Sequence, residues 1–140
     1  MASTSFGPLR IAHGFGNSRR RLSRALIGPV DLIETDVWFQ DSKIVVRHEH
    51  KLGPLPLLID RKTNLHLKGE HRFRLPLWRS YIALERNPLA LEEVLARAKD
   101  RRGLLLDLKG EYGDQEEGLA QALAEMLQRM GMEEQATICG

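Results

Sequence analysis

The chain has 140 residues, of which 42% are hydrophobic and 29% are charged, and its formal net charge is +2. This composition is ordinary for a globular protein, and the length suits a single domain over 1–140 rather than two well-buried cores. The small net charge gives no reason to expect nucleic acid or an anionic membrane as a partner.

Three further features bear on location and cofactors. The segment "MASTSFGPLRIAHGFG" lacks a basic region followed by an apolar run, so no signal peptide is expected. No stretch approaches the roughly 18 apolar residues of a membrane span, so we expect a cytoplasmic protein without stable membrane insertion. Cys139 is the only cysteine, which excludes an internal disulfide and a cysteine-based zinc site.

The predicted elements alternate between strands and helices. Apolar runs closed by glycine or turn residues predict strands, and amphipathic stretches between capping residues predict helices. In chain order we expect a strand over 9–14, a helix over 17–26 capped by Asn17 or Ser18, strands over 31–39 and 43–49, a helix over 89–100 begun by Asn87 and Pro88, a strand over 103–110, a helix over 115–130 capped by Asp114, and a strand over 136–139. This alternation predicts the α/β class, with a largely parallel sheet covered by helices.

Two segments depart from this alternation. Only six residues separate Val37 from Ile44, too few for a helical crossover, so the two strands form either a hairpin or a tight non-helical return. Residues 51–86 mix prolines, basic residues and isolated apolar residues without a steady period. They predict a long irregular connection that could contain short helices and act as a lid.

Carboxylates gather on the strands expected in the middle of the sheet. Glu34 and Asp36 point to the same side of one strand because side chains alternate along it, and Asp107 lies on another strand. Active sites of barrels and open α/β sheets lie at the carboxyl ends of strands, where Asp36 and Asp107 are expected. Three converging carboxylates predict a site for Mg²⁺ or Ca²⁺.

Histidines and a lysine are expected at the same edge of the sheet. His13 and His48 lie at or near the ends of their predicted strands, and Lys109 points to the same side as Asp107. Two imidazoles can serve as acid and base near neutral pH, and a lysine can neutralise phosphoryl oxygens, a set that suits phosphodiester chemistry. Each residue alone also has a structural interpretation, such as a solvated strand face or a core histidine, and His50 is expected to be a bystander.

The motifs together resemble the glycerophosphodiester phosphodiesterases, members of the phospholipase-C-like phosphodiesterase superfamily. The residues that carry the resemblance are "IAHGFGN", "DLIETDVWF", "IVVRHEHKLGPLPLL" and "LLLDLKG", over positions 10–50 and 87–110. The family pattern is His-Arg-Gly, Glu-x-Asp, His-Asp and acidic-x-Lys on successive strands. Four short motifs in this order make the resemblance specific, and it covers the N-terminal half of the family or slightly more.

The resemblance implies the N-terminal part of a TIM-type (β/α) barrel with parallel strands, and metal-dependent hydrolysis of glycerophosphodiesters to glycerol 3-phosphate and an alcohol. Carried over by position, it implies these roles: Glu34, Asp36 and Asp107 bind the divalent cation, His13 and His48 are the acid and base, and Lys109 contacts phosphate. The implied partner is a small-molecule glycerophosphodiester from lipid metabolism.

The chain departs from the family at several positions. Gly14 stands where the family has arginine, so Arg19 or Arg20 would have to supply the phosphate clamp. Glu49 replaces the usual aspartate, and Asp107 replaces the commoner glutamate. A TIM barrel needs about 250 residues, so a chain of 140 residues corresponds to a truncated barrel.

Other functional interpretations remain open at this point. A truncated barrel could be non-catalytic and need a partner, or could form a homo-oligomer if the half barrel is the native product, because its sheet edges would be unpaired. A third interpretation is a phospholipid phosphodiesterase that resembles sphingomyelinase D, with 51–86 facing lipid. A nucleic-acid binder is the weakest, because the arginine-rich stretch lacks interleaved aromatic residues.

Overall fold

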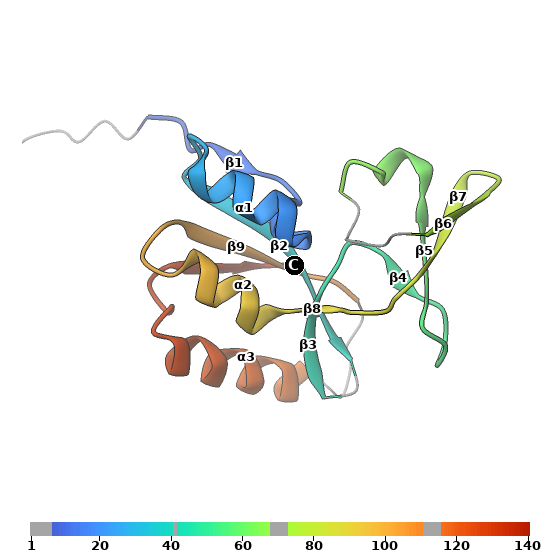
Figure 1. Ribbon diagram of the computed structural model, residues 1–140. Coiled ribbons are helices and arrows are strands. Elements are labelled where there is room, and N and C mark those ends of the chain that lie inside the picture. Colours follow the sequence, from blue (N-terminus) through green and yellow to red (C-terminus); the bar gives the residue numbers. More distant parts are fainter. Residues whose placement is uncertain (1–6, 41, 68–72, 111–115) are drawn as a thin grey trace, which may run out of the picture.

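The computed structural model of the chain describes residues 7–40, 42–67, 73–110 and 116–140, and within them it has two sheets and three α-helices (Figure 1). The elements are β1 (Ile11–Ala12), the 3-10 helix η1 (Phe15–Asn17), α1 (Arg19–Ile27), β2 (Leu32–Gln40), β3 (Lys43–Val46), β4 (His50–Lys51), β5 (Leu57–Arg61), the 3-10 helix η2 (Lys62–Asn64), β6 (Arg74–Leu77), β7 (Ser80–Leu84), β8 (Leu89–Ala90), α2 (Leu91–Ala98), β9 (Gly103–Leu108), α3 (Glu116–Met130) and β10 (Ala136–Cys139). In this part of the chain, no helix is long and apolar enough to cross a membrane.

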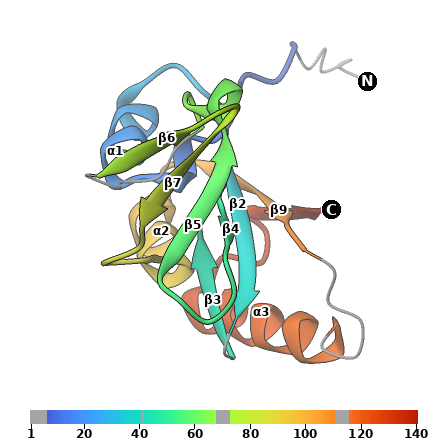
Figure 2. The same ribbon diagram turned by 90° about the vertical axis from the view of Figure 1, so that its right-hand side faces the viewer.

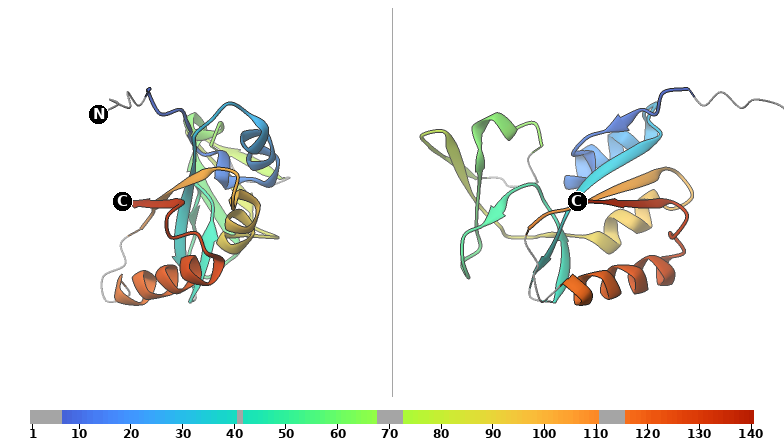
Figure 3. Two further views of the ribbon diagram at one scale, coloured as in Figure 1. Left: turned by 90° about the vertical axis from the view of Figure 1, so that its left-hand side faces the viewer. Right: turned by 180° about the vertical axis from the view of Figure 1, so that it is seen from behind.

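The main sheet has the strand order β10-β9-β2-β3-β8, and β1 also pairs with β2. Strands β1, β2, β9 and β10 are parallel, and α1, α2 and α3 lie on one face of the sheet, while the view from behind shows the strands of the other face (Figure 3). The core lies between the sheet and the helices, where Ile33 and Leu104 meet Leu22 and Leu95. The predicted α/β class is therefore confirmed.

Strands β2 and β3 form an antiparallel hairpin. Val37 pairs with Val46 and Gln40 pairs with Lys43, so the chain reverses in a tight turn that includes Ser42 at a φ of 59°. The hairpin decides between the two alternatives that the sequence left open. It also corrects the expectation of parallel strands taken from the resemblance, because so short a connection permits only antiparallel pairing.

A second sheet, with the antiparallel order β4-β5-β7-β6, occupies the segment for which the sequence predicts an irregular connection. That prediction is wrong for its strands. Alternate positions are buried, Leu58 and Asp60 on β5 and Tyr81 and Ala83 on β7. The strands are short and interrupted by prolines, so their period of two is too brief to be recognised in the sequence.

The three helices lie where the sequence predicts them, but not all of their predicted first residues and caps are observed. The Ser18 hydroxyl accepts a hydrogen bond from the Arg21 N–H and caps the N-terminus of α1, and Gly28 is its C-cap. Helix α2 begins at Leu91 rather than at Pro88, because Leu89 and Ala90 pair with β3 as β8 and are therefore extended. The predicted Asp114 cap of α3 lies outside the described residues.

Candidate metal and acid–base site

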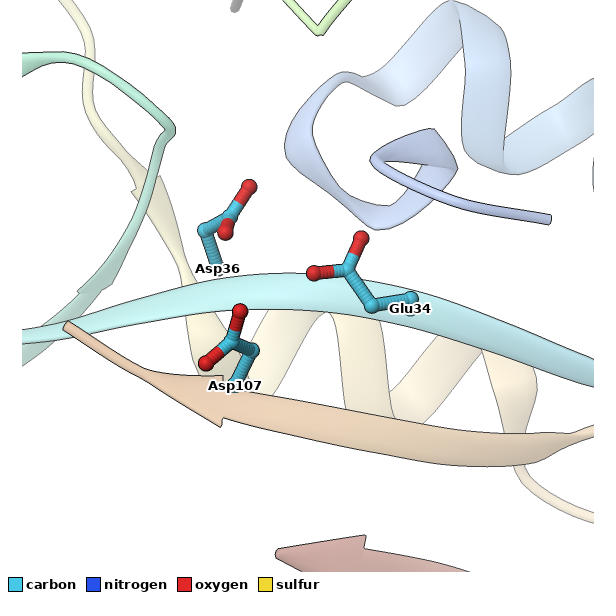
Figure 4. A group of neighbouring side chains, drawn as sticks. All are labelled: Glu34, Asp36 and Asp107. Atoms are coloured by element: carbon cyan, nitrogen blue, oxygen red, sulfur yellow. The ribbon is translucent and has the colours of Figure 1, made fainter. Parts of the chain in front are cut away.

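The three predicted carboxylates lie together on the face of the main sheet opposite to the helices. Strands β2 and β9 pair in parallel with Asp36 opposite Asp107, and Glu34 lies two residues earlier on the same side of β2. One ligand atom from each carboxylate lies within 4.8 Å of the other two. Figure 4 shows these side chains converging from the two strands. Glu34 and Asp36 are buried, with 3% and 1% exposure, while Asp107 is half-buried.

The 3-10 helix η1 holds the two carboxylates of β2 in place. On one edge of β2, β1 pairs with the beginning of the strand and β3 with its end. Between these pairings, the Gly14 N–H donates to Glu34, and the Asn17 amide donates to the Asp36 carboxylate while its Oδ1 accepts from the Asp36 N–H at 2.9 Å. Asn17 is 1% exposed. Sequence reasoning treated it only as a helix cap, and the single weak signal was its place after the His-Gly motif.

Gly16 allows η1 to lie directly against β2. A Cβ atom at this position would lie 1.7 Å from the Thr35 Oγ1 and 2.6 Å from the Thr35 Cβ. We expect Gly16→Ala to destabilise the protein by about 2 kcal/mol, because overpacking of this kind moves backbone. Gly118→Ala on α3 is the matched control: nothing lies within 4 Å of its added Cβ, and alanine there should stabilise by roughly 0.5–1 kcal/mol. Urea unfolding measures both, and equal effects would contradict the packing argument.

Lys109 binds two of the three carboxylates. Its Nζ lies 3.1 Å from the Asp36 Oδ1 and also donates to Asp107. Burial by itself would lower the pKa of Lys109, but its hydrogen bonds to Asp107 and Asp36 outweigh burial and raise the pKa. The ammonium is therefore charged at neutral pH. One ammonium beside three carboxylates leaves two negative charges when all four groups are ionised, so the cluster attracts a further cation.

Glu34 gives the clearest sign that a ligand belongs in the cluster. Its Oε1 is buried and has no hydrogen-bond partner among the described residues, while its Oε2 accepts from the Gly14 N–H. Burial, followed by the charge of Asp36, raises the pKa of this carboxyl, and the Gly14 N–H opposes that shift. A buried oxygen without a partner is costly. Oxygen donors of this kind suit Mg²⁺ or Ca²⁺, so the residues present fit a divalent cation.

His13 lies at the edge of the cluster. It follows β1, its side chain is 63% exposed, and its Nδ1 lies 3.6 Å from the Glu34 Oε2. The ring is therefore next to the carboxylates and accessible to solvent. This placement agrees with the sequence, which puts the residue at the end of the first strand.

His48 is held by a residue that sequence reasoning missed. Its Nδ1 lies 2.5 Å from the Asp60 Oδ2, and the Asp60 Oδ1 accepts from the Arg61 N–H at 2.7 Å and from the Asn64 Nδ2 at 2.9 Å. Among the described residues, neither a hydrogen bond nor an ion pair links His48 to the three carboxylates. Asp60 lies on β5, in the segment taken as irregular, and its only sequence signal was its place after a short apolar run.

The residues around His48 attach the second sheet to the main sheet. Glu49 is fully buried and accepts from the Tyr81 hydroxyl at 2.9 Å. Arg47 donates to the Glu85 carboxylate at 2.9 Å and to the Glu49 carbonyl at 3.1 Å. Burial, together with the Glu49 charge, raises the pKa of Tyr81, so its hydroxyl remains a donor. Glu49, which stands where the family pattern has aspartate, therefore helps to join the two sheets through its hydrogen bond with Tyr81.

Arg19 and Arg20 are the two residues expected to replace the arginine that the family has at position 14. The guanidinium of Arg19 contacts a helix instead of the acidic cluster. Arg19 Nη2 lies 2.7 Å from the Glu93 Oε2, so its guanidinium joins α1 to α2 on the helix-covered side of the sheet. Arg20 is exposed on α1. Helix packing therefore accounts for Arg19, whereas Lys109 contacts Asp36 and Asp107 directly.

No protein-family model and no curated protein matches the chain. A glycerophosphodiester phosphodiesterase from Parabacteroides distasonis is 18% identical with a TM-score of 0.60, covering 93% of this chain and 55% of that one. Another from Agrobacterium tumefaciens is 17% identical with a TM-score of 0.57, covering 94% and 57%. The glycerophosphoryl diester phosphodiesterase domain of an uncharacterized Mycobacterium tuberculosis protein is 18% identical with a TM-score of 0.60, covering 95% and 52%.

These matches confirm the resemblance that the motifs indicated, at the level of the fold. The chain spans about half the length of the solved structures it matches. Over that length it has the fold of the glycerophosphodiester phosphodiesterases.

Proposed function

We propose that the chain carries the catalytic residues for metal-dependent hydrolysis of glycerophosphodiesters to glycerol 3-phosphate and an alcohol, within glycerophospholipid metabolism. The observation that carries the proposal is the buried acidic cluster of Glu34, Asp36 and Asp107, in which the Glu34 Oε1 has no hydrogen-bond partner among the described residues. The fold supports it, since the neighbours that share it are glycerophosphodiester phosphodiesterases. The chain would be the corresponding part of a TIM-type barrel.

The carboxylates of Glu34, Asp36 and Asp107 would hold the cation, Mg²⁺ or Ca²⁺. When bound, it would supply positive charge for the phosphoryl oxygens of the substrate. Lys109 is the second source of positive charge, and its contacts with Asp36 and Asp107 keep its ammonium beside the same place. The divalent cation and the Lys109 ammonium would therefore both contact the phosphate and would separate it from the negative charges of the carboxylates.

Hydrolysis needs one proton removed and one delivered. A water oxygen attacks phosphorus, the bond from phosphorus to the alcohol oxygen breaks, and the alcohol oxygen takes up a proton. His13 and His48 would share these two transfers as base and acid. The Nδ1 of His13 faces Glu34 and the Nδ1 of His48 faces Asp60, which leaves the Nε2 of each ring for the substrate. Asp60 would fix the orientation of His48.

Release of glycerol 3-phosphate from glycerophosphocholine tests the proposal, measured with Mg²⁺, with Ca²⁺ and after chelation. We expect turnover that depends on the cation, and a decrease of about 10²–10⁴-fold in His13→Ala, the range for loss of a general acid or base. Chelation should abolish turnover in the wild type. If the wild type and His13→Ala release product at the same rate with every cation, the chain is not the catalyst.

A further inference from the structure

We propose that the outer face of the second sheet is a peripheral binding surface for an anionic lipid bilayer. The strand registers define this face. Ile59, Ile82 and Leu75 are neighbours across β5, β7 and β6, and Arg61, Ser80 and Leu77 form the next row. Directly paired residues share a face. The opposite, inner face carries the buried residues Leu58, Tyr81 and Ala83. Figure 2 shows the second sheet in front of the rest of the molecule, with no described helix over it.

Large apolar side chains are exposed just before β6, along it and in the turn that follows it. Phe73 is 64% exposed, Leu75 70%, Leu77 51% and Trp78 87%. Trp78 stands in the turn between β6 and β7 with a φ of 46°, a conformation that is strained for a bulky residue. Contiguous exposed apolar residues mark interaction sites, and tryptophan is enriched at the interface between membrane and water.

Positive charge surrounds these apolar residues. Residues 51–86 contain eight lysines and arginines against three aspartates and glutamates, a net charge of +5, so the rest of the chain, whose total is +2, carries −3. Arg61, Lys62 and Arg79 are exposed at the end of the sheet near Trp78. Among the described residues, no carboxylate forms an ion pair with these three cations. Arg61, Lys62 and Arg79 therefore give this face of the sheet a basic end, which the small net charge of the whole chain hides.

This combination favours a bilayer over the other possible occupants. A second copy of the chain would place one basic face against another, which is electrostatically unfavourable. An anionic bilayer offers phosphate groups to the arginines and an apolar interior to Leu75, Leu77 and Trp78, in the same plane. Binding would be peripheral, through the outer face of the second sheet and the turn between β6 and β7, without insertion of a helix.

The proposal does not depend on the proposed hydrolysis. Asp60 and Tyr81 alternate with the outer residues and lie on the inner face, where they contact His48 and Glu49. A bilayer on the outer face would therefore leave those contacts intact. Loss of membrane binding and loss of activity would be separate results.

Sedimentation with phospholipid vesicles tests the proposal. We expect the chain to bind vesicles of phosphatidylcholine mixed with phosphatidylglycerol, to bind pure phosphatidylcholine at least tenfold more weakly, and to dissociate as salt is added. Arg79→Glu should weaken binding about tenfold, and Leu75→Ser combined with Trp78→Ala should weaken it at least as much. The matched control is Ile27→Ser, which removes a side chain that is 81% exposed at the end of α1, a helix that covers the main sheet and not the second sheet.

Tryptophan fluorescence locates the contact. The emission should shift to shorter wavelength with anionic vesicles, and Trp78→Phe should keep the binding but lose most of the shift, because the other tryptophan, Trp38, is on β2 of the main sheet, where it is half-buried and donates to the Arg47 carbonyl. Equal binding by the wild type and Arg79→Glu would overturn the proposal, as would binding that Ile27→Ser reduces equally. A dimer in solution that Trp78→Ala dissociates would assign the face to a second copy instead.

Discussion

Replacing Glu34 by glutamine is expected to stabilise the cation-free protein and to remove its response to Mg²⁺ or Ca²⁺. The raised pKa of Glu34, caused by burial and by Asp36, means that its ionised form is less favourable in the folded chain than in the unfolded chain. Removing that charge should stabilise by about 1 kcal/mol, within the range for such changes at strained sites, or a few degrees in Tm. Thermal unfolding with and without Mg²⁺ measures both effects.

The pH dependence of this effect has a definite sign. Because the folded pKa of Glu34 lies above its ordinary value of 4.5, the group costs nothing below that value, where it is protonated in both states. Its cost grows as pH rises from that value to the folded pKa, where only the unfolded state is ionised, and stays constant above it. The stability difference between Glu34→Gln and the wild type should therefore be smallest in acid and largest at neutral pH.

Ionisation of Glu34 lowers the stability of the cation-free protein, but it should increase the stabilisation that a bound cation provides. In the wild type, Mg²⁺ should raise Tm, and more strongly as Glu34 deprotonates, because only the carboxylate binds the ion. Glu34→Gln should lose this rise and should lower turnover by at least 10³-fold. Glu133→Gln, at an exposed carboxylate, is the matched control and should change stability by less than about 0.5 kcal/mol. A variant that is less stable without cation, yet still stabilised by it, would contradict the assignment of Glu34 as a ligand.

Asp60→Asn is expected to lower kcat by about 10²-fold or more, within the range for loss of a general acid or base, with little change in KM. The asparagine would keep the size of the side chain but would lose the carboxylate that holds the Nδ1 of His48 at 2.5 Å. Because Asp60 is on β5, away from the acidic cluster, substrate binding should be spared. Steady-state kinetics with glycerophosphocholine measures the two constants separately.

A double-mutant cycle shows whether Asp60 acts through His48. In the His48→Ala protein, Asp60→Asn should have no further effect on kcat, since residues that act as a unit are not additive. Asp31→Asn is the matched control: it disrupts an exposed ion pair with Arg10 at 2.9 Å and should leave kcat unchanged. If Asp60→Asn lowers kcat by the same factor in both backgrounds, Asp60 supports the fold of the second sheet rather than the orientation of His48.

Much of the main sheet could be predicted from the sequence because its signals are local. Alternation along β2 puts Glu34 and Asp36 on one side, and the glycine-bounded run of β9 puts Asp107 near a strand end. Both features depend on neighbouring residues, so the acidic cluster could be expected before the fold was seen. The second sheet could not, because β4 to β7 are too short for a period of two to be distinct, and their pairing joins residues as distant in sequence as Leu57 and Leu84.

The sequence by itself determined the α/β class, the three carboxylates and the histidines on which the proposed chemistry rests. The tertiary structure decided that β2 and β3 form a hairpin, that Asn17 fills the gap between β1 and β3 beside Asp36, and that Asp60 reaches His48. The reason is physical: side-chain direction along a strand follows from the period of the backbone, whereas contacts between separate elements depend on register and on how the sheets pack.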